Sequence, residues 1–281
     1  MGMTRARCRR SDMRKSCLAL MVLGLLGPAT AIAQSTDDDA ARAERWHELQ
    51  QAIFGDRTIG DGTGIITLDA PQRALDAALV PITITTAADR NVTGVALVID
   101  DNPGPLAARV RFGPAGDPGF LALRVRVNQY TLMHAVAETS DGQLHETAKF
   151  VKAAGGCSAP VGENEAASLA EIGRMKLRLQ GEAVAGAPVE AQLMIRHPNF
   201  NGMQMDQLTR LYTPMRFVQV VDISFDGAEV LHLEGDISLS TDPVIGFRFL
   251  PGALPGKLKV MVRDSDNATY EASFDVPASG S

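Results

Sequence analysis

The chain lacks an excess of basic residues, a membrane-spanning apolar run and the common motifs of enzymes. Its formal net charge is −6 over 281 residues, whereas a surface that binds nucleic acid needs surplus Lys and Arg. It contains no Gly-x-Ser-x-Gly elbow, no His-Glu-x-x-His motif, no phosphate-binding glycine loop and no cysteine pair. The sequence therefore predicts no nucleic-acid partner, no metal and no cofactor, and a protein that is not itself an enzyme.

The N-terminus has the layout of a secretory signal peptide. Basic residues crowd positions 5–15, an apolar run follows over residues 17–26, and small residues lead up to Ala33. The run is shorter than the roughly 20 residues that span a bilayer. We predict that residues 1–33 are removed on export to the periplasm and leave no membrane anchor. The pair Arg9-Arg10 hints at the twin-arginine route, so both export routes stay open.

The mature chain is predicted to be all-β, with two sandwich domains and one N-terminal helix. Apolar residues recur at helical spacing over residues 40–54, and alternation of period two begins at Ile65. In residues 121–127, for example, Leu and Val alternate with Ala122, Arg124 and Arg126. Such alternation places the apolar side chains in a core and the two arginines on the water-facing side of a strand.

Turn-forming residues stand between the predicted strands. Asp141-Gly142 and Asp226-Gly227 are hairpin signals, each flanked by two such strands. Glycine and proline clusters at 102–105 and 113–119 are expected to separate further strands. Several short strands at this spacing favour antiparallel sandwiches.

The alternation stops near residue 153 and resumes at Met175, which predicts a domain boundary. The first sandwich, with its helix, is expected over residues 34–154, and the second over residues 175–277. Residues 155–174 form a linker, with a helical turn expected over 165–172. No residue-by-residue repeat relates the two halves.

Signal-peptide removal takes away Cys8 and Cys17 and leaves Cys157 as the sole cysteine. An unpaired cysteine in an exported protein implies an intermolecular bond or a free thiol with a role. Gly155 and Gly156 precede it and give the backbone wide freedom. Counted from Phe150, an extended arm would reach roughly 23–25 Å. We therefore expect Cys157 on a mobile arm, not in a packed core; a buried cysteine or a linker cysteine without a role are the plain alternatives.

An enzymatic role for Cys157 would require a base beside it. The histidines His47, His134, His145, His197 and His232 stand in no recognisable catalytic frame. One cysteine and scattered histidines also do not form a zinc pattern. Three functional classes remain: a covalent carrier loaded on Cys157, a non-covalent adaptor for a periplasmic dehydrogenase, and an enzyme that uses Cys157 as nucleophile.

Several short segments, in a fixed order, resemble the SoxY and SoxZ sulfur carriers of bacterial thiosulfate oxidation, here fused in one chain. The SoxY-like segments are residues 54–57, 66–71, 78–83, 101–107, 136–139 with 141–142, and 155–157. The SoxZ-like segments are residues 195–198, 221–227 and 257–260. Each segment alone is weakly specific, and the specificity lies in their order around the glycine-cysteine arm.

This resemblance implies two packed immunoglobulin-like sandwiches. It also implies that Cys157 holds S-linked sulfur intermediates, with Gly155 and Gly156 as the hinge of its arm. No cofactor is implied beyond this covalent sulfur adduct, and the partners are periplasmic sulfur-oxidation or quinoprotein dehydrogenase system proteins. In SoxY proper the arm ends the chain, whereas here Ser158 and a second domain follow, so the arm is tethered at both ends. The fusion favours the subfamily associated with quinoprotein dehydrogenases.

Overall fold

The computed structural model describes residues 29–159, 169–205 and 209–278. Helix α1 (Ala29–Phe54) is followed by β-strands and one short 3-10 helix, η1 (Ala88–Arg90). The predicted helix end at Phe54 is confirmed, but the helix begins at Ala29 and not at residue 40. Residues up to Ala41 form a unit of their own, and residues from Arg42 onward form the β unit. Most of the predicted signal peptide lies outside the described residues, so its removal stays a prediction.

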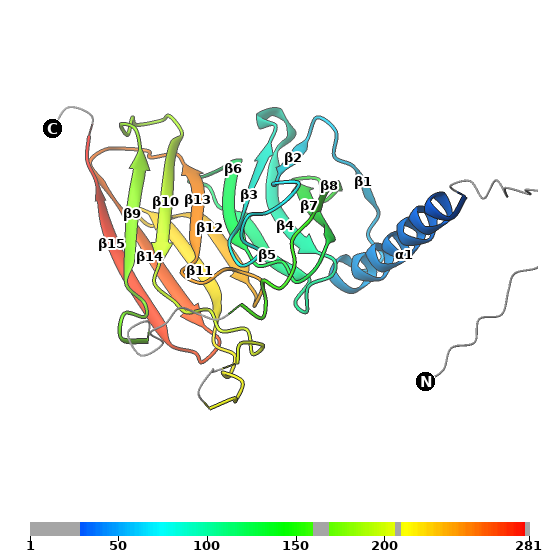
Figure 1. The fold of residues 1–281 in the computed structure, drawn as a ribbon. Helices are drawn as coiled ribbons and strands as arrows, with labels where there is room; N and C mark the ends of the chain where they lie inside the picture. The colour runs from blue at the N-terminus through cyan, green and yellow to red at the C-terminus, as the bar shows by residue number, and fades with distance from the viewer. Residues whose placement is uncertain (1–28, 160–168, 206–208, 279–281) are drawn as a thin grey trace, which may run out of the picture. The chain divides into compact units, whose positions relative to one another are not determined.

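Two sheets make up the β unit (Figure 1). The nine-stranded sheet has the order β1 (Ile59–Asp61), β8 (Leu144–Val151), β7 (Thr131–Thr139), β4 (Val92–Ile99), β5 (Leu106–Phe112), β12 (Ala228–Gly235), β11 (Val218–Phe225), β14 (Gly256–Asp264), β15 (Thr269–Val276). The six-stranded sheet has the order β2 (Ile66–Asp69), β3 (Val80–Thr86), β6 (Gly116–Val125), β13 (Val244–Phe249), β10 (Val189–Ile195), β9 (Met175–Gln180). The predicted all-β fold of immunoglobulin-like sandwiches is confirmed.

The two halves of the chain join edge to edge in both sheets. In the nine-stranded sheet β5 pairs antiparallel with β12, and in the six-stranded sheet β6 pairs antiparallel with β13. The main apolar core is accordingly one cluster shared by both halves, with members from Ile66 through to Val276. Two sandwiches were expected on either side of residues 155–174; the structure shows that they share both layers and one core.

The turns follow the sequence closely. Asp226 and Gly227 both have positive φ, 46° and 88°, between β11 and β12. A two-residue turn with this backbone matches the twist of a hairpin. The cluster at residues 113–119 differs from its prediction, because β6 already begins at Gly116 and includes Pro118. The pairing of β6 with β13 shifts register here, between Phe247 and Arg248, and such a bulge is where a strand tolerates proline.

A second, smaller core lies where the end of α1 packs on the nine-stranded sheet. Trp46 of the helix is 8% exposed and clusters with Ala96 and Val98 of β4. Its ring stacks on the imidazole of His134, at 3.6 Å between centroids and 7° between planes. Helix packing therefore buries the second face of β4, whose first face lines the main core.

His134 in this smaller core is a buried group between two carboxylates. Its Nε2 lies 3.2 Å from Asp100 Oδ2, and its Nδ1 lies 3.4 Å from Glu146 Oε2. Burial by itself lowers the pKa of His134, but the two carboxylates outweigh burial and raise that pKa above its ordinary value. The imidazolium charge is thus matched by nearby carboxylates.

Within the described residues, no helix has the length and apolarity needed to cross a membrane.

Candidate functional site

Cys157 is buried in this structure. It lies after β8 in a short turn and is 2% exposed. The expectation of a mobile arm outside the core is therefore corrected for this conformation. The residues before it, Ala153 to Gly156, do lack large side chains, but they pack against the backbone of the protein itself. We call this state, with Cys157 inside, the retracted conformation.

The two glycines are needed for different reasons. Gly156 donates its N–H to Val127 O at 2.9 Å, and a Cβ added there would lie 2.0 Å from Ala77 O. Gly155 donates to Asn128 O at 2.8 Å and has φ +81°, with nothing within 4 Å of an added Cβ. Gly156 thus permits close backbone packing, while Gly155 permits a left-handed turn. The role of the two glycines as the hinge of an arm stays a prediction.

The second half of the chain closes over Cys157. Asn201, which is 2% exposed, donates from Nδ2 to Cys157 O at 2.7 Å. The Asn201 N–H in turn donates to Gln204 Oε1 at 3.0 Å. The Gln204 side chain is also buried, and its Nε2 has no hydrogen-bond partner among the described residues. A polar loop of the second half therefore holds the cysteine of the first half in place.

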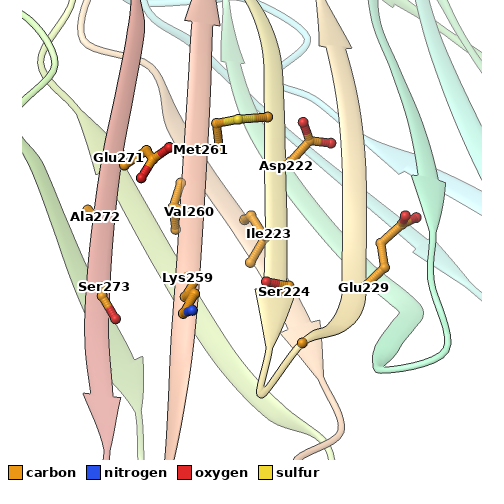
Figure 2. A pocket seen from close by; sticks show the side chains of 11 residues that line it. Asp222, Ile223, Ser224, Glu229, Lys259, Val260, Met261, Glu271, Ala272 and Ser273 are labelled. Carbon is orange, nitrogen blue, oxygen red and sulfur yellow. The ribbon is translucent and has the colours of Figure 1, made fainter.

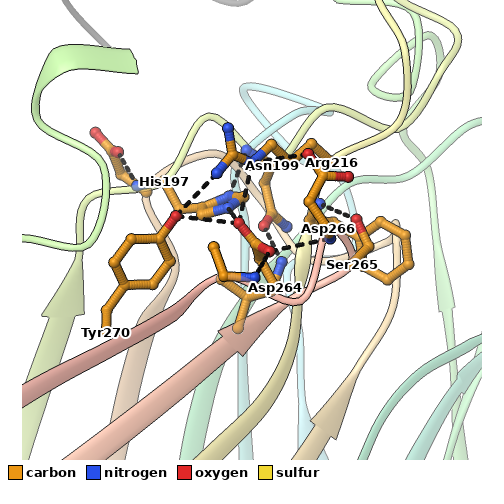
Figure 3. Close-up of polar contacts among 11 residues, drawn as sticks. His197, Asn199, Arg216, Asp264, Ser265, Asp266 and Tyr270 are labelled. Carbon is orange, nitrogen blue, oxygen red and sulfur yellow. Dashed lines mark hydrogen bonds and ion pairs between the residues drawn. The ribbon is translucent and has the colours of Figure 1, made fainter.

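This loop is itself fixed by the network in Figure 3. Asn199 donates its N–H to His197 Nδ1 at 3.0 Å and accepts from Val218 N at 2.9 Å. The His197 Nε2 lies 3.5 Å from Asp264 Oδ2, and Asp264 accepts from Arg216 Nε at 3.0 Å. Burial lowers the pKa of His197, which outweighs the opposing effect of Asp264. A neutral His197 accepting at Nδ1 keeps the loop, and with it Asn201, in position.

Arg126 is the charged group that acts electrostatically on Cys157. It follows β6 directly and is 1% exposed. Its guanidinium donates to Leu239 O at 2.7 Å, Ile237 O at 3.3 Å and Thr241 Oγ1 at 2.8 Å. All three acceptors are neutral oxygens, and no carboxylate pairs with it among the described residues. Burial lowers the pKa of Arg126 to about 10, and the negative charge that Cys157 can carry opposes this shift.

The thiol of Cys157 is correspondingly hard to ionise. Burial raises its pKa from 9.0 to about 11, although the nearby Arg126 charge works in the opposite direction. A thiol with this pKa is protonated at neutral pH, and the thiolate is the reactive form. The retracted conformation therefore keeps the sulfur unreactive. In the described part of the chain no histidine pairs with it, so the base that a cysteine nucleophile needs is not beside it here.

The sequence interpretation missed both Arg126 and Asn201. Strand alternation predicted that Arg126 faces water, but residues 237–241 of the second half cover that side of β6 and bury it. One signal was available in the segment 101–107. Its Asn102 donates to Arg126 O at 2.7 Å and to Ser238 Oγ at 2.9 Å, and accepts from Asn128 N at 2.9 Å. This segment thus positions both Arg126 and the backbone that receives the glycines.

The surface also has a groove and a cleft, and the groove has no residue of the cysteine segment in its lining. A groove of about 630 Å³ crosses strands β11, β12, β14 and β15, with Asp222, Met261 and Glu271 among its side chains (Figure 2). A cleft of about 1080 Å³ does border the cysteine segment, because Ala159 lines it together with Thr241. Its lining holds four basic side chains, Arg124, Arg174, Lys176 and Arg196, and three acidic ones, Asp76, Glu171 and Asp242, and we call it the basic cleft. The described residues contain no cluster of three or more His, Cys, Asp or Glu side chains able to hold a metal ion.

Comparison with known proteins gives two family matches in tandem. Residues 50–157 match the family described as "Sulfur oxidation protein SoxY", and residues 177–275 match "Sulphur oxidation protein SoxZ". The first match ends on Cys157, and the two matches together cover most of the chain. No curated protein matches it.

Two solved structures show more distant likeness. The sulfur carrier protein SoxY from Chlorobium limicola f thiosulfatophilum is 25% identical, with a TM-score of 0.36, over 42% of this chain and 98% of that chain. A beta-glycosidase from Bacteroides vulgatus is 11% identical, with a TM-score of 0.24, over 75% of this chain and 24% of that chain. The family is shown by the two sequence matches.

Proposed function

Because the chain is a fused SoxYZ-like sulfur carrier, with a SoxY domain followed by a SoxZ domain, we propose that it carries its cargo covalently on Cys157. The observation that supports this is the position of Cys157. It is the last residue of the SoxY match, its thiol lies within the electrostatic influence of Arg126, and its carbonyl accepts a hydrogen bond from Asn201 of the SoxZ domain. The cargo is a sulfur-containing group joined to Sγ through an S–S bond.

The chemistry of loading indicates the class of partner. Joining the Cys157 thiol to a second reduced sulfur releases two electrons, and these must pass to an oxidant. A redox enzyme is therefore the partner that loads the carrier, and further enzymes act on the bound cargo. We propose that these are sulfur-oxidation or quinoprotein dehydrogenase system proteins, and that the carrier itself is not an enzyme.

The compartment follows from the N-terminal sequence. Its basic start, short apolar run and small-residue tail support export with cleavage after Ala33. The protein then works in the periplasm, where Cys157 is its sole thiol. An exported carrier would meet its partner enzymes there.

Carriage requires two positions of the cysteine segment. In the retracted conformation the sulfur is shielded and its pKa is about 11, so cargo is protected from stray thiols. Exchange with a partner requires the segment to move outward. Among the described residues, three hydrogen bonds must break, one each from Gly155 N–H, Gly156 N–H and the Asn201 amide.

Intact-mass measurement on protein isolated from its native cells, grown with a reduced sulfur compound, tests this proposal. We expect an added mass on the peptide that contains Cys157, released by a thiol reductant. The variant Cys157→Ser should lose both the adduct and growth that depends on the carrier, whereas the adjacent Ser158→Ala should retain both.

An adaptor that binds a dehydrogenase without covalent cargo would behave differently. It would show an unmodified Cys157 under all growth conditions and full activity of Cys157→Ser in cells. Either result would overturn the proposal of covalent carriage and favour the adaptor.

A further inference from the structure

Arg126 presents an unusual electrostatic arrangement. A charge buried away from water is costly unless an opposite charge accompanies it, and buried arginines are for this reason commonly paired with carboxylates. Arg126 is 1% exposed, yet its hydrogen bonds go to Leu239 O, Ile237 O and Thr241 Oγ1. No carboxylate pairs with it in the described part of the chain. Arg126 therefore carries a positive charge that no described side chain neutralises.

The position of Cys157 suggests where that partner belongs. Gly156 donates to Val127 O, which places the cysteine segment against the residue that follows Arg126. Cys157 is also the group whose charge acts on Arg126 and opposes the effect of burial on its pKa. Asn201 links the Cys157 carbonyl to Gln204, whose buried Nε2 has no hydrogen-bond partner among the described residues. The Arg126 guanidinium and the Gln204 N–H are both groups that can bind an anion.

The basic cleft borders this region. Ala159, two positions after Cys157, lines it, and so does Thr241, which accepts the hydrogen bond from Arg126. Arg124 and Lys176 also line it, and neither has an ion-pair partner among the described residues. By contrast, Arg196 of the same cleft is paired with Asp242. The lining also contains Asp76, which has no ion-pair partner among the described residues either, so the unpaired charge of the cleft is positive on balance.

We propose that Arg126 is the specificity-determining residue of the cargo site, and that its guanidinium binds the anionic end of a group attached to Cys157 in the retracted conformation. This inference rests on the proposed function, because it assigns a recognition residue to the same site. An S-linked anion supplies the charge that Arg126 lacks. A neutral or cationic cargo leaves Arg126 unmatched, so such a cargo favours the outward position of the segment.

Two methanethiosulfonate reagents provide matched probes. In each reaction the Cys157 sulfur attacks the reagent's thio sulfur and displaces methanesulfinate, leaving an S–S bond and needing no oxidant. One reagent leaves an ethylsulfonate group, which is anionic, and the other leaves an ethyltrimethylammonium group, which is cationic. The protein is the full chain with Cys8→Ser and Cys17→Ser, so that only Cys157 reacts, and intact mass confirms one adduct.

The readout is the rate at which 2-mercaptoethanol removes each adduct, divided by the rate for the same adduct in urea-unfolded protein. We expect the anionic adduct to be protected roughly tenfold more than the cationic adduct, the size of one charge-assisted hydrogen bond. In Arg126→Met this preference should fall to near unity, and in Arg126→Lys it should be partly retained. Arg111→Met removes an exposed positive charge from the other sheet and should keep the full preference.

Equal protection of the two adducts in the unsubstituted protein would overturn the role of Arg126, and so would a preference that survives in Arg126→Met. Folding of each variant is checked by its thermal unfolding before labelling. Failure here leaves covalent carriage itself standing, because the reagents label Cys157 whatever Arg126 does. Carriage fails only if no native adduct is found on Cys157.

Discussion

Two buried cations in this molecule have opposite surroundings. His134 lies between Asp100 and Glu146 and under the ring of Trp46, and its charge is balanced within the protein. Among the described residues, the Arg126 guanidinium donates its hydrogen bonds to neutral oxygens, and Cys157 is the group whose charge acts on it. A balanced charge serves the fold, since its partners are permanent. An unbalanced charge near the sulfur that carries the cargo can instead bind a group that is present only while the carrier is loaded.

The largest expected effect comes from removing His134. His134→Ala leaves Asp100, which is 2% exposed, without its cation, and breaking a buried pair in this way costs about 3–5 kcal/mol. Arg126→Met should cost less, about 1–2 kcal/mol, since relief of an unmatched buried charge offsets part of the hydrogen bonds lost. Urea unfolding measures both, with the exposed His47→Ala as control. Equal costs at the two sites would remove the contrast between them.

Forcing Cys157 away from Arg126 is expected to have the next largest effect. In Gly156→Ala the new Cβ would lie 2.0 Å from Ala77 O, so the retracted conformation cannot form as it stands. We expect the thiol to react with a neutral disulfide reagent on the order of a hundred times faster, which corresponds to about 2.7 kcal/mol.

Gly155→Ala is the matched control for that experiment. It has open space for the Cβ but a φ of +81°, which costs an L-residue roughly 1–2 kcal/mol. Its thiol should therefore be exposed less than that of Gly156→Ala. The reverse order of labelling rates would show that backbone strain, and not close packing, holds the segment in.

Asn201→Ala tests the contact between the two halves at the cysteine. It removes the hydrogen bond to Cys157 O, worth about 0.5–1.5 kcal/mol, so labelling should accelerate roughly two- to twelvefold. Thr269→Ala, an exposed position at the start of β15 in the same half, is expected to leave the rate unchanged. No acceleration in Asn201→Ala would mean that the segment is held by its own half alone.

The smallest expected effect is a difference between the two sites in how their contribution to the unfolding free energy depends on pH. The pKa of His134 is raised on folding, so its stabilising contribution is complete below pH about 6.5 and is lost as pH rises through the folded value. Arg126, with a pKa of about 10, does not titrate in this range. The difference in unfolding free energy between the unsubstituted protein and His134→Gln should therefore shrink as the pH rises above about 6.5 and through the raised folded pKa. The same difference for Arg126→Met should stay constant.

Much of the fold could be predicted, because its cues are local. Alternating apolar residues marked nearly all the strands, and Asp226-Gly227 supplied the positive φ values that its hairpin needs. The three-residue strand β1 was missed, since three residues are too few to show alternation. The sharing of both sheets was missed as well. A strand's sequence shows which side is apolar, but not which edge meets another strand.

The cysteine site was predicted only in part, for the same reason. Cys157 and its glycines stood out because they are rare residues in a local run. Their burial could not be predicted, since it depends on Ala77, Val127 and Asn201, which lie far away in the sequence. Arg126 was assigned to the solvent side of its strand, and only the covering segment from the other half reverses that assignment.

The edge-to-edge junction of the halves, β5 with β12 and β6 with β13, has a consequence for how the protein is made. Each half alone would display two open sheet edges, which readily pair with the wrong chain and aggregate. Covalent linkage presents the correct partner at high effective concentration as soon as both halves are synthesised. Assembly then no longer depends on the abundance of a separate subunit, and the ratio of the two halves is fixed at one to one by the gene itself.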